Sequence, residues 1–214
     1  TGGATVSAAL VALGAVPAVA AVTITNGTIS AADASTISTA TNGKVTATIT
    51  PDTAAQIAAD LTGAISTDAL NITVNGANAD VTDLNAIDTQ TALKVKVDSA
   101  TVTAANYAEF EGIYVTGKNN FSNLGDENIT VTAATINSAQ ADIVAKATSK
   151  VVTATIAGES AASVVTNLKN ANAKDEFDIT LTNVATSAKD LLTLDGKTSV
   201  IVKAGAITAA ITGT

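Results

Sequence analysis

The stretch VTATI occurs twice in the chain, at Val45–Ile49 within GKVTATITPDTAAQIAADL (43–61) and at Val152–Ile156 within SKVVTATIAGESAASVVTNL (149–168). The two stretches lie 107 positions apart, and the same offset, applied without a gap, matches identical residues along much of the sequence. Such a long ungapped match indicates an internal duplication. The matched pairs include Thr23 and Thr130, Ile29 and Ile136, Ala40 and Ala147, Leu61 and Leu168, Asp68 and Asp175, Ile72 and Ile179, Leu84 and Leu191, Asp88 and Asp195, and Lys96 and Lys203. We therefore divide the chain into a first copy, 1–107, and a second copy, 108–214.

Each copy contains a shorter repeat, in which β-branched runs alternate with segments whose apolar residues have helical spacing. Alternation of β-branched and small residues is typical of short strands. The expected strands are 22–25, 45–49, 72–74, 95–97, 129–132, 152–156, 179–182 and 200–202.

Between these runs, a Ser, Thr or Asp precedes each apolar segment. Such side chains accept a hydrogen bond from a free amide of the first helical turn, so they predict helix N-caps. The expected caps are Ser7, Ser30, Thr53, Asp80, Thr103, Ser138, Ser160 and Ser187. Helices of two or three turns are unstable alone in water, so they must pack on the strands.

Strands and helices joined by such brief connections predict parallel strands with crossover helices. We expect an α/β repeat protein, a βα solenoid-like stack of short parallel strands and short helices. The alternative is a pair of similar compact α/β domains in tandem, divided near residue 107. We favour one continuous stack because residues 99–113, SATVTAANYAEFEGI, read as a helix rather than a linker.

Composition removes most chemical functions. The 214 residues include no His, Cys, Met or Trp, and all eleven basic residues are Lys. Without His or Cys, the usual hydrolytic triads, zinc sites and disulfides are excluded, so we expect no enzyme and no cofactor. The net charge of −8 opposes nucleic-acid binding. An acidic chain that is rich in Thr and free of thiols predicts an extracellular location.

The uncharged segment Ala4–Val22 has three interpretations. Thr5–Ala9 matches Thr101–Ala105 at an offset of 96, which favours a further cap and helix of the repeat. The other two are a remnant of a signal peptide and a strand donated to a neighbouring subunit. We expect no membrane span.

The difference between the offsets of 107 and 96 places an insertion near Gly112–Glu127. Departures from a repeat are where binding sites tend to arise. The predicted interaction loop comprises Tyr114, Lys118, Asn119, Asn120 and Phe121, with surface glycans as a possible partner. In the competing interpretation the aromatic residues are structural: Tyr107 and Phe110 belong to the core of a helix, and Phe121 fills the longer loop.

Alternation also predicts a threonine face on the strands, opposite the apolar layer. Such ranks of hydroxyls resemble the ice-binding surface of solenoid antifreeze proteins, although Lys94, Lys96 and Lys203 interrupt them. The face comprises Thr23, Thr25, Thr46, Thr48, Thr130, Thr132, Thr153, Thr155, Thr180 and Thr182.

Calcium binding has weak support from the sequence. Neither an EF-hand loop nor a glycine-aspartate repeat occurs. The best acidic clusters are Asp80, Asp83 and Asp88, and Asp126 with Glu127. We expect these carboxylates to cap helices and to solvate the surface.

Three segments, TGGATVSAALVAL (1–13), 122–156 and 186–214, resemble repeats of very large secreted surface proteins of marine cyanobacteria. The resemblance implies a tandem module of an adhesin, motility-associated or S-layer-like protein. Such a module would space or self-assemble through its two ends. Those proteins often carry calcium-binding repeats, which this sequence lacks. The alternative is a ligand-binding module that acts through the 112–127 loop or the threonine face.

Overall fold

The computed structural model describes residues 20–41, 43–132, 134–205 and 207–213. Contacts divide the chain into unit 1, Thr1–Ala100 with Thr116–Asn123, and unit 2, Thr101–Val115 with Leu124–Thr214. The division of the sequence into copies at 107 stays a prediction. The interpretations of Ala4–Val22 and the helix expected after Ser7 fall almost wholly on residues 1–19, outside the described residues.

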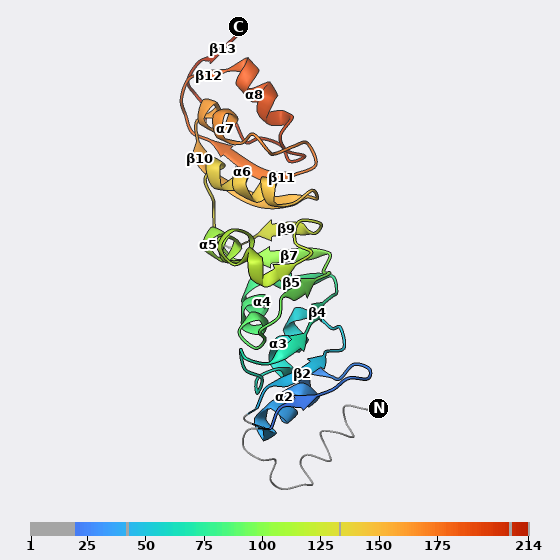
Figure 1. Ribbon diagram of the computed structural model, residues 1–214. Helices are drawn as coiled ribbons and strands as arrows, with labels where there is room; N and C mark the ends of the chain where they lie inside the picture. Colours follow the sequence, from blue (N-terminus) through green and yellow to red (C-terminus); the bar gives the residue numbers. More distant parts are fainter. Residues whose placement is uncertain (1–19, 42, 133, 206, 214) are drawn as a thin grey trace. The chain divides into compact units, whose positions relative to one another are not determined.

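Unit 1 contains two three-stranded parallel sheets with helices between successive strands (Figure 1). The first sheet has the order β1 (Val22–Thr23), β2 (Val45–Thr48), β3 (Ala69–Asn71), and the second β4 (Thr73–Val74), β6 (Val95–Val97), β8 (Phe121–Ser122). Its other elements are β5 (Asn78–Asp80), α2 (Ala31–Ala40), α3 (Ala54–Asp60), α4 (Val81–Asp88) and the 3-10 turn η2 (Lys118–Asn120).

Unit 2 has the same alternation of strands and helices. Parallel pairing joins β11 (Glu176–Leu181), β10 (Val152–Glu159), β9 (Asn128–Val131) and β7 (Thr101–Ala104) in that order, and β12 (Thr186–Ser187) pairs with β13 (Ile211–Thr212). The helices are α5 (Tyr107–Glu111), α6 (Ser138–Ala147), α7 (Ala161–Asn167) and α8 (Ala188–Asp195), and the π-helix η1 (Gly112–Thr116) follows α5. The protein is thus an α/β fold with several small, all-parallel sheets.

The sequence duplication is also a duplication of structure. Val22 pairs with Val45 in unit 1, and Ile129 pairs with Val152 in unit 2. Likewise Thr73 pairs with Lys96, and Thr180 forms a bridge to Lys203. Helices α2 and α6, α3 and α7, and α4 and α8 begin and end at positions 107 apart. Each of these strand pairs joins residues 23 apart, whereas β7 and β9 pair over 27 residues and β12 and β13 over 25. We call a strand, together with the helix and loop that lead to the next paired strand, a coil.

Small side chains that alternate along the strands form the core. In the first VTATI stretch Val45, Ala47 and Ile49 are buried, whereas Thr46 is half-buried and Thr48 exposed. The second stretch repeats this pattern from Val152 to Ile156. Because neighbouring strand residues point to opposite sides, each stretch buries its apolar residues and presents its hydroxyls outward, as predicted.

Most predicted caps are confirmed, and two are corrected. Ser30, Thr53, Asp80, Ser160 and Ser187 accept hydrogen bonds from first-turn amides. The other two predicted caps are wrong, and asparagines take their place. Thr103 belongs to β7, and Asn106 caps α5 instead. Asn137 caps α6 with a reciprocal bond to Gln140, and Ser138, the first residue of that helix, instead donates its hydroxyl to Glu159.

The prediction of a helix over 99–113 is wrong for the first half of that range. Thr101–Ala104 forms β7, which pairs with β9 and buries Val102 and Ala104. The α-helix starts only at Tyr107. The strand expected at 200–202 is also absent, since pairing there is limited to the bridge between Lys203 and Thr180.

Candidate functional site

The predicted interaction loop separates into two parts. Tyr114 belongs to unit 2, whereas Lys118, Asn119, Asn120 and Phe121 belong to unit 1. Phe121 is buried in β8, where it pairs with Val95, as expected of a side chain that fills the loop. The polar residues Lys118, Asn119 and Asn120 are exposed on η2. The surface part of this loop is therefore polar.

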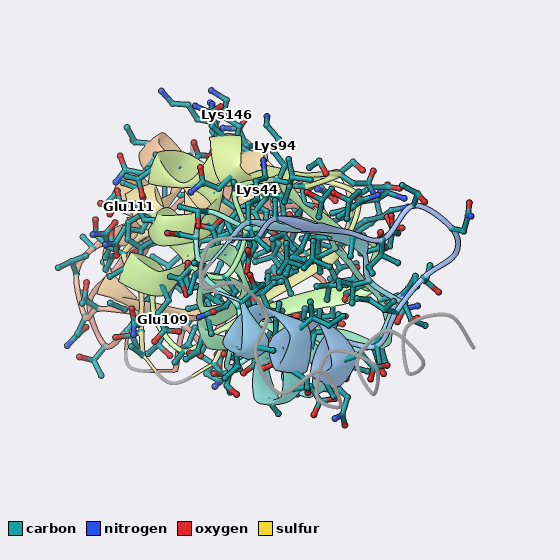
Figure 2. The ribbon with its side chains drawn as sticks, turned by 60° about the horizontal axis from the view of Figure 1, so that its bottom comes forward. Lys44, Lys94, Glu109, Glu111 and Lys146 are labelled. Carbon is teal, nitrogen blue, oxygen red and sulfur yellow. The ribbon has the colours of Figure 1, made fainter. Side chains whose placement is uncertain are left out.

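Asn119 and Asn120 line a pocket of ≈ 300 Å³ in unit 1. The other lining residues come from the end of α4 and the loop that follows it, namely Asp88, Thr91, Ala92, Leu93 and Lys94. Asn120 Nδ2 donates a hydrogen bond to Asp88 Oδ2 at 2.8 Å, which ties η2 to α4. Lys94, labelled in Figure 2, is exposed at the same pocket. Sequence reasoning did not connect Asp88 with this loop.

Thr91, which lines the pocket, fixes the backbone around it. Its buried hydroxyl accepts hydrogen bonds from the amides of Leu70 and Leu93, each at 3.1 Å, and lies 2.9 Å from the Leu70 carbonyl to which it donates. The pocket thus presents one carboxylate, one ammonium and two amides over a fixed loop. Donors and acceptors of this variety suit a polyhydroxylated ligand better than an apolar one.

The hydroxyl of Thr91 has a counterpart 107 positions later. Thr198 Oγ1 accepts from the amides of Phe177 at 2.9 Å and Val200 at 3.1 Å, and it donates to the carbonyls of Phe177 and Asp175. Each threonine therefore hydrogen-bonds to the strand of the preceding coil. We call Thr91 and Thr198 the threonine clamps.

Two buried aspartates perform a similar task. Asp68 accepts from the amides of Val45 at 2.7 Å and Ile65 at 3.0 Å, and from the hydroxyl of Ser38. Asp175 accepts from the amides of Val152 at 3.0 Å and Asn172 at 2.9 Å. A buried carboxylate is stable only when such donors satisfy it. We call Asp68 and Asp175 the aspartate clamps, since each joins its own loop to the strand of the preceding coil.

The half-buried Tyr114 and the buried Glu127 form a polar pair within the insertion. Glu127 is 2% exposed and accepts from the amides of Gly125 and Asp126, both at 3.0 Å, and from the Tyr114 hydroxyl. Burial and the neighbouring Glu127 carboxylate raise the pKa of Tyr114 well above its ordinary value. The Tyr114 ring stacks on Phe110 with centroids 4.9 Å apart. Tyr114 is thus a support of the insertion rather than an exposed contact residue.

A third polar cluster joins α6 to α7 in unit 2. Glu159 accepts from the amide of Ser138 at 2.7 Å, from the hydroxyl of Ser138 at 2.8 Å and from the hydroxyl of Ser163 at 2.9 Å. Burial raises the pKa of Glu159, but these hydrogen bonds outweigh it, so the pKa is lowered overall. The carboxylate therefore fastens the starts of both helices when it is ionised.

The acidic clusters considered for calcium serve other purposes. Asp80 caps α4, Asp88 accepts from Asn120, and Asp126 forms an exposed ion pair with Lys150 at 3.2 Å. Burial and the Asp80 charge raise the pKa of Asp83. Among the residues that the structure describes, no three acidic side chains are arranged to hold a metal ion.

Part of the predicted threonine face can be followed in unit 2, where an acidic residue ends a rank of threonines. In unit 2, Thr103, Thr130 and Thr153 lie in one rank across β7, β9 and β10, and the rank then reaches Glu176. Thr153 Oγ1 donates to that carboxylate at 3.1 Å. The predicted face residues are exposed at Thr23, Thr25, Thr48, Thr132, Thr155, Thr180 and Thr182, and half-buried at Thr46, Thr130 and Thr153.

In the described part of the chain, no helix is long and apolar enough to cross a membrane. The polar pocket and the repeated clamps are the two features that bear on function. The chain matches no protein-family model, no curated protein and no solved structure.

Proposed function

We propose that the protein is a structural repeat module of an extracellular surface protein, without catalytic activity. The observation that carries this proposal is the recurrence of the same buried clamps, Asp68 with Thr91 and Asp175 with Thr198, 107 positions apart. Each clamp joins one coil to the preceding coil. Buried polar groups that hold neighbouring coils together support a scaffold that can be extended by further copies of the repeat.

The finer architecture that we propose is a βα solenoid-like stack within each unit. Residues 23 apart pair in parallel in both units, and the intervening helices are short. In such a stack each coil buries its apolar face against its neighbours, so small Ala, Val and Ile side chains suffice for the core.

An extracellular location is supported by the acidic, thiol-free composition and by the resemblance to secreted cyanobacterial surface repeats. Immunolabelling tests this part. Antibodies against the purified protein should label intact cells of the source organism, and protease treatment of intact cells should remove the signal. A cytosolic protein of the same cells serves as the control. Labelling that requires permeabilised cells would refute the proposal.

A second candidate function is ligand binding, which the pocket of unit 1 supports. Asp88, Lys94, Asn119 and Asn120 offer the hydrogen-bonding groups that a glycan needs. Screening on a glycan array should identify a ligand whose binding falls about tenfold or more in Asn119→Ala and Asn120→Ala, because each change removes an amide at the pocket. Asn75→Ala, an exposed residue outside the pocket, is the control. Equal binding by all three variants would refute a glycan site there.

Ice binding through the threonine face has less support, since Glu176 ends the longest rank described above. Thermal hysteresis of a dilute solution, compared with that of Thr48→Lys, decides it, and absence of hysteresis in the wild type rejects it.

A further inference from the structure

The last coil of unit 2 carries the most exposed large apolar side chains of the described residues. Ile201 is 84% exposed, Leu192 75% and Ile211 57%. Strand β13 pairs with β12, and no described strand pairs with its other edge. Within the part of the chain that the structure describes, this coil therefore presents apolar surface and a strand that is paired on one side.

The first copy shows how the same positions are covered. Ala104, 107 positions before Ile211, is 1% exposed, because β7 pairs with β9 and places Ala104 beside Val131. Val95, the equivalent of the half-buried Val202, is fully buried where β6 pairs with β8. In the first copy, therefore, the coil that follows pairs with these strands and buries their apolar residues.

The opposite edge of the repeat is β1, the equivalent of β9. Strand β9 pairs with β10 on one side and with β7 on the other, whereas β1 pairs only with β2 among the described residues. Accordingly Val22 and Ile24 are half-buried, but their equivalents Ile129 and Val131 are buried. The β7·β9 pair is therefore a template for joining the two edges.

We propose that β1 of a second copy of this chain pairs in parallel with the segment 208–211, in the register of β7 and β9. Thr208, Ala209, Ala210 and Ile211 would lie opposite Ala21, Val22, Thr23 and Ile24 of the second copy, respectively. This assignment rests on the proposed function, because it specifies the contact through which the module self-assembles end to end.

Asn183 orders the backbone of this segment, and the Ala209 amide would exchange Asn183 for a carbonyl of the second copy on pairing. Asn183 Oδ1 accepts hydrogen bonds from the amides of Thr208 at 2.8 Å and Ala209 at 3.0 Å, and its Nδ2 donates to Thr208 Oγ1 at 2.7 Å. An edge that is already ordered loses less conformational entropy on association. Addition of a strand to an open edge supplies main-chain hydrogen bonds, and burial of Ile211 with Val22 and Ile24 adds an apolar contribution.

Engineered cysteines test the register, since the chain has none of its own. Thr23 and Ala210 are both exposed, so Thr23→Cys and Ala210→Cys leave the core intact. The two variants are purified separately, mixed at micromolar concentration and oxidised. We expect disulfide-linked heterodimers to form about tenfold faster or more than in a mixture of Thr25→Cys and Ala210→Cys, because pairing raises the local thiol concentration to millimolar. Equal rates in the two mixtures would overturn the proposed register.

Sedimentation of the unmodified chain provides the second measurement. We expect concentration-dependent association that Ile211→Lys abolishes and Ile65→Lys preserves, because Ile65 is exposed in the loop between α3 and β3, which is not part of the proposed contact. A wild-type protein that stays monomeric at millimolar concentration would overturn the proposed contact. If antibodies label intact cells but the purified protein is monomeric, the proposal of a surface module stands and only this contact is rejected.

Discussion

Replacing the Thr198 clamp by valine tests whether its hydroxyl stabilises unit 2. Valine keeps the shape of threonine but neither donates nor accepts a hydrogen bond. The amide of the fully buried Phe177 would lose its acceptor at 2.9 Å, and the Phe177 carbonyl would lose its donor, whereas the Asp175 carbonyl would keep the amide of Ser199. Thr198→Val should therefore lower the free energy of unfolding of unit 2.

The size of the loss follows from the groups left without partners. A buried amide without an acceptor costs about 1–3 kcal/mol, and a lost hydrogen bond of the hydroxyl adds about 1 kcal/mol. We expect a total of about 3 kcal/mol. With a denaturant dependence of about 2 kcal/mol per molar urea, the unfolding midpoint should fall by roughly 1.5 M.

Tyrosine fluorescence during urea unfolding reports this unit selectively. The chain has two tyrosines and no tryptophan, and both tyrosines, Tyr107 and Tyr114, belong to unit 2. Circular dichroism follows both units in the same samples. Thr155→Val, at an exposed position of β10, is the control, and we expect it to change stability by less than about 0.5 kcal/mol.

Serine distinguishes the hydroxyl from packing. Thr198→Ser keeps the hydroxyl and loses one methyl group, so it should cost only about 1 kcal/mol. The explanation fails if Thr198→Val unfolds at the wild-type urea concentration. It also fails if Thr198→Ser loses as much stability as Thr198→Val, because packing would then account for the effect.

Three further predictions concern other polar and small residues. Because the pKa of Glu159 is lowered in the folded protein, its ionised carboxylate stabilises the fold above the ordinary glutamate pKa of 4.5, and this stabilisation is lost as pH falls. Glu159→Gln should therefore flatten the acid side of a plot of melting temperature against pH. The raised pKa of Tyr114 means that stability falls as pH rises above the ordinary tyrosine value of 10.0, since the unfolded chain ionises first; Tyr114→Phe should reduce this alkaline loss but cost about 2 kcal/mol at pH 7, by urea unfolding. In Gly63→Ala the new methyl carbon would lie 2.7 Å from the Ser35 carbonyl oxygen, so circular dichroism should show a loss of about 1–3 kcal/mol, whereas Gly112→Ala, with no such contact, should be neutral.

Local patterns predicted the scaffold well. The two VTATI stretches gave the correct buried and exposed sides, because alternation in a strand depends on neighbouring residues alone. Ser30 and Thr53 were recognisable as caps for a similar reason, since a cap acts within one helical turn. The same rule missed Asn106, because Thr103 occupied an equally good cap sequence and only its pairing in β7 excluded it.

The pocket could not be predicted because it depends on contacts between distant residues. Asp88 and Asn120 are 32 positions apart and meet only after η2 folds beside α4. The threonine clamps were hidden for another reason. Thr91 is one of many threonines, and its sequence context does not distinguish a buried hydroxyl from an exposed one.

The aspartate and threonine clamps also have a consequence for how the length of this protein can change. Asp68 accepts a hydrogen bond from the strand of the coil before it, and Thr91 donates one to the Asp68 carbonyl. Successive coils thus carry different clamps. Deleting a single stretch of 23 residues would change the order in which aspartate and threonine clamps follow one another. Adding or removing 107 residues would keep the order of the clamps, because Asp68 and Asp175, and Thr91 and Thr198, lie 107 positions apart. Lengthening and shortening of the gene should therefore proceed in whole copies, which makes the long repeat, and not the coil, the unit of inheritance.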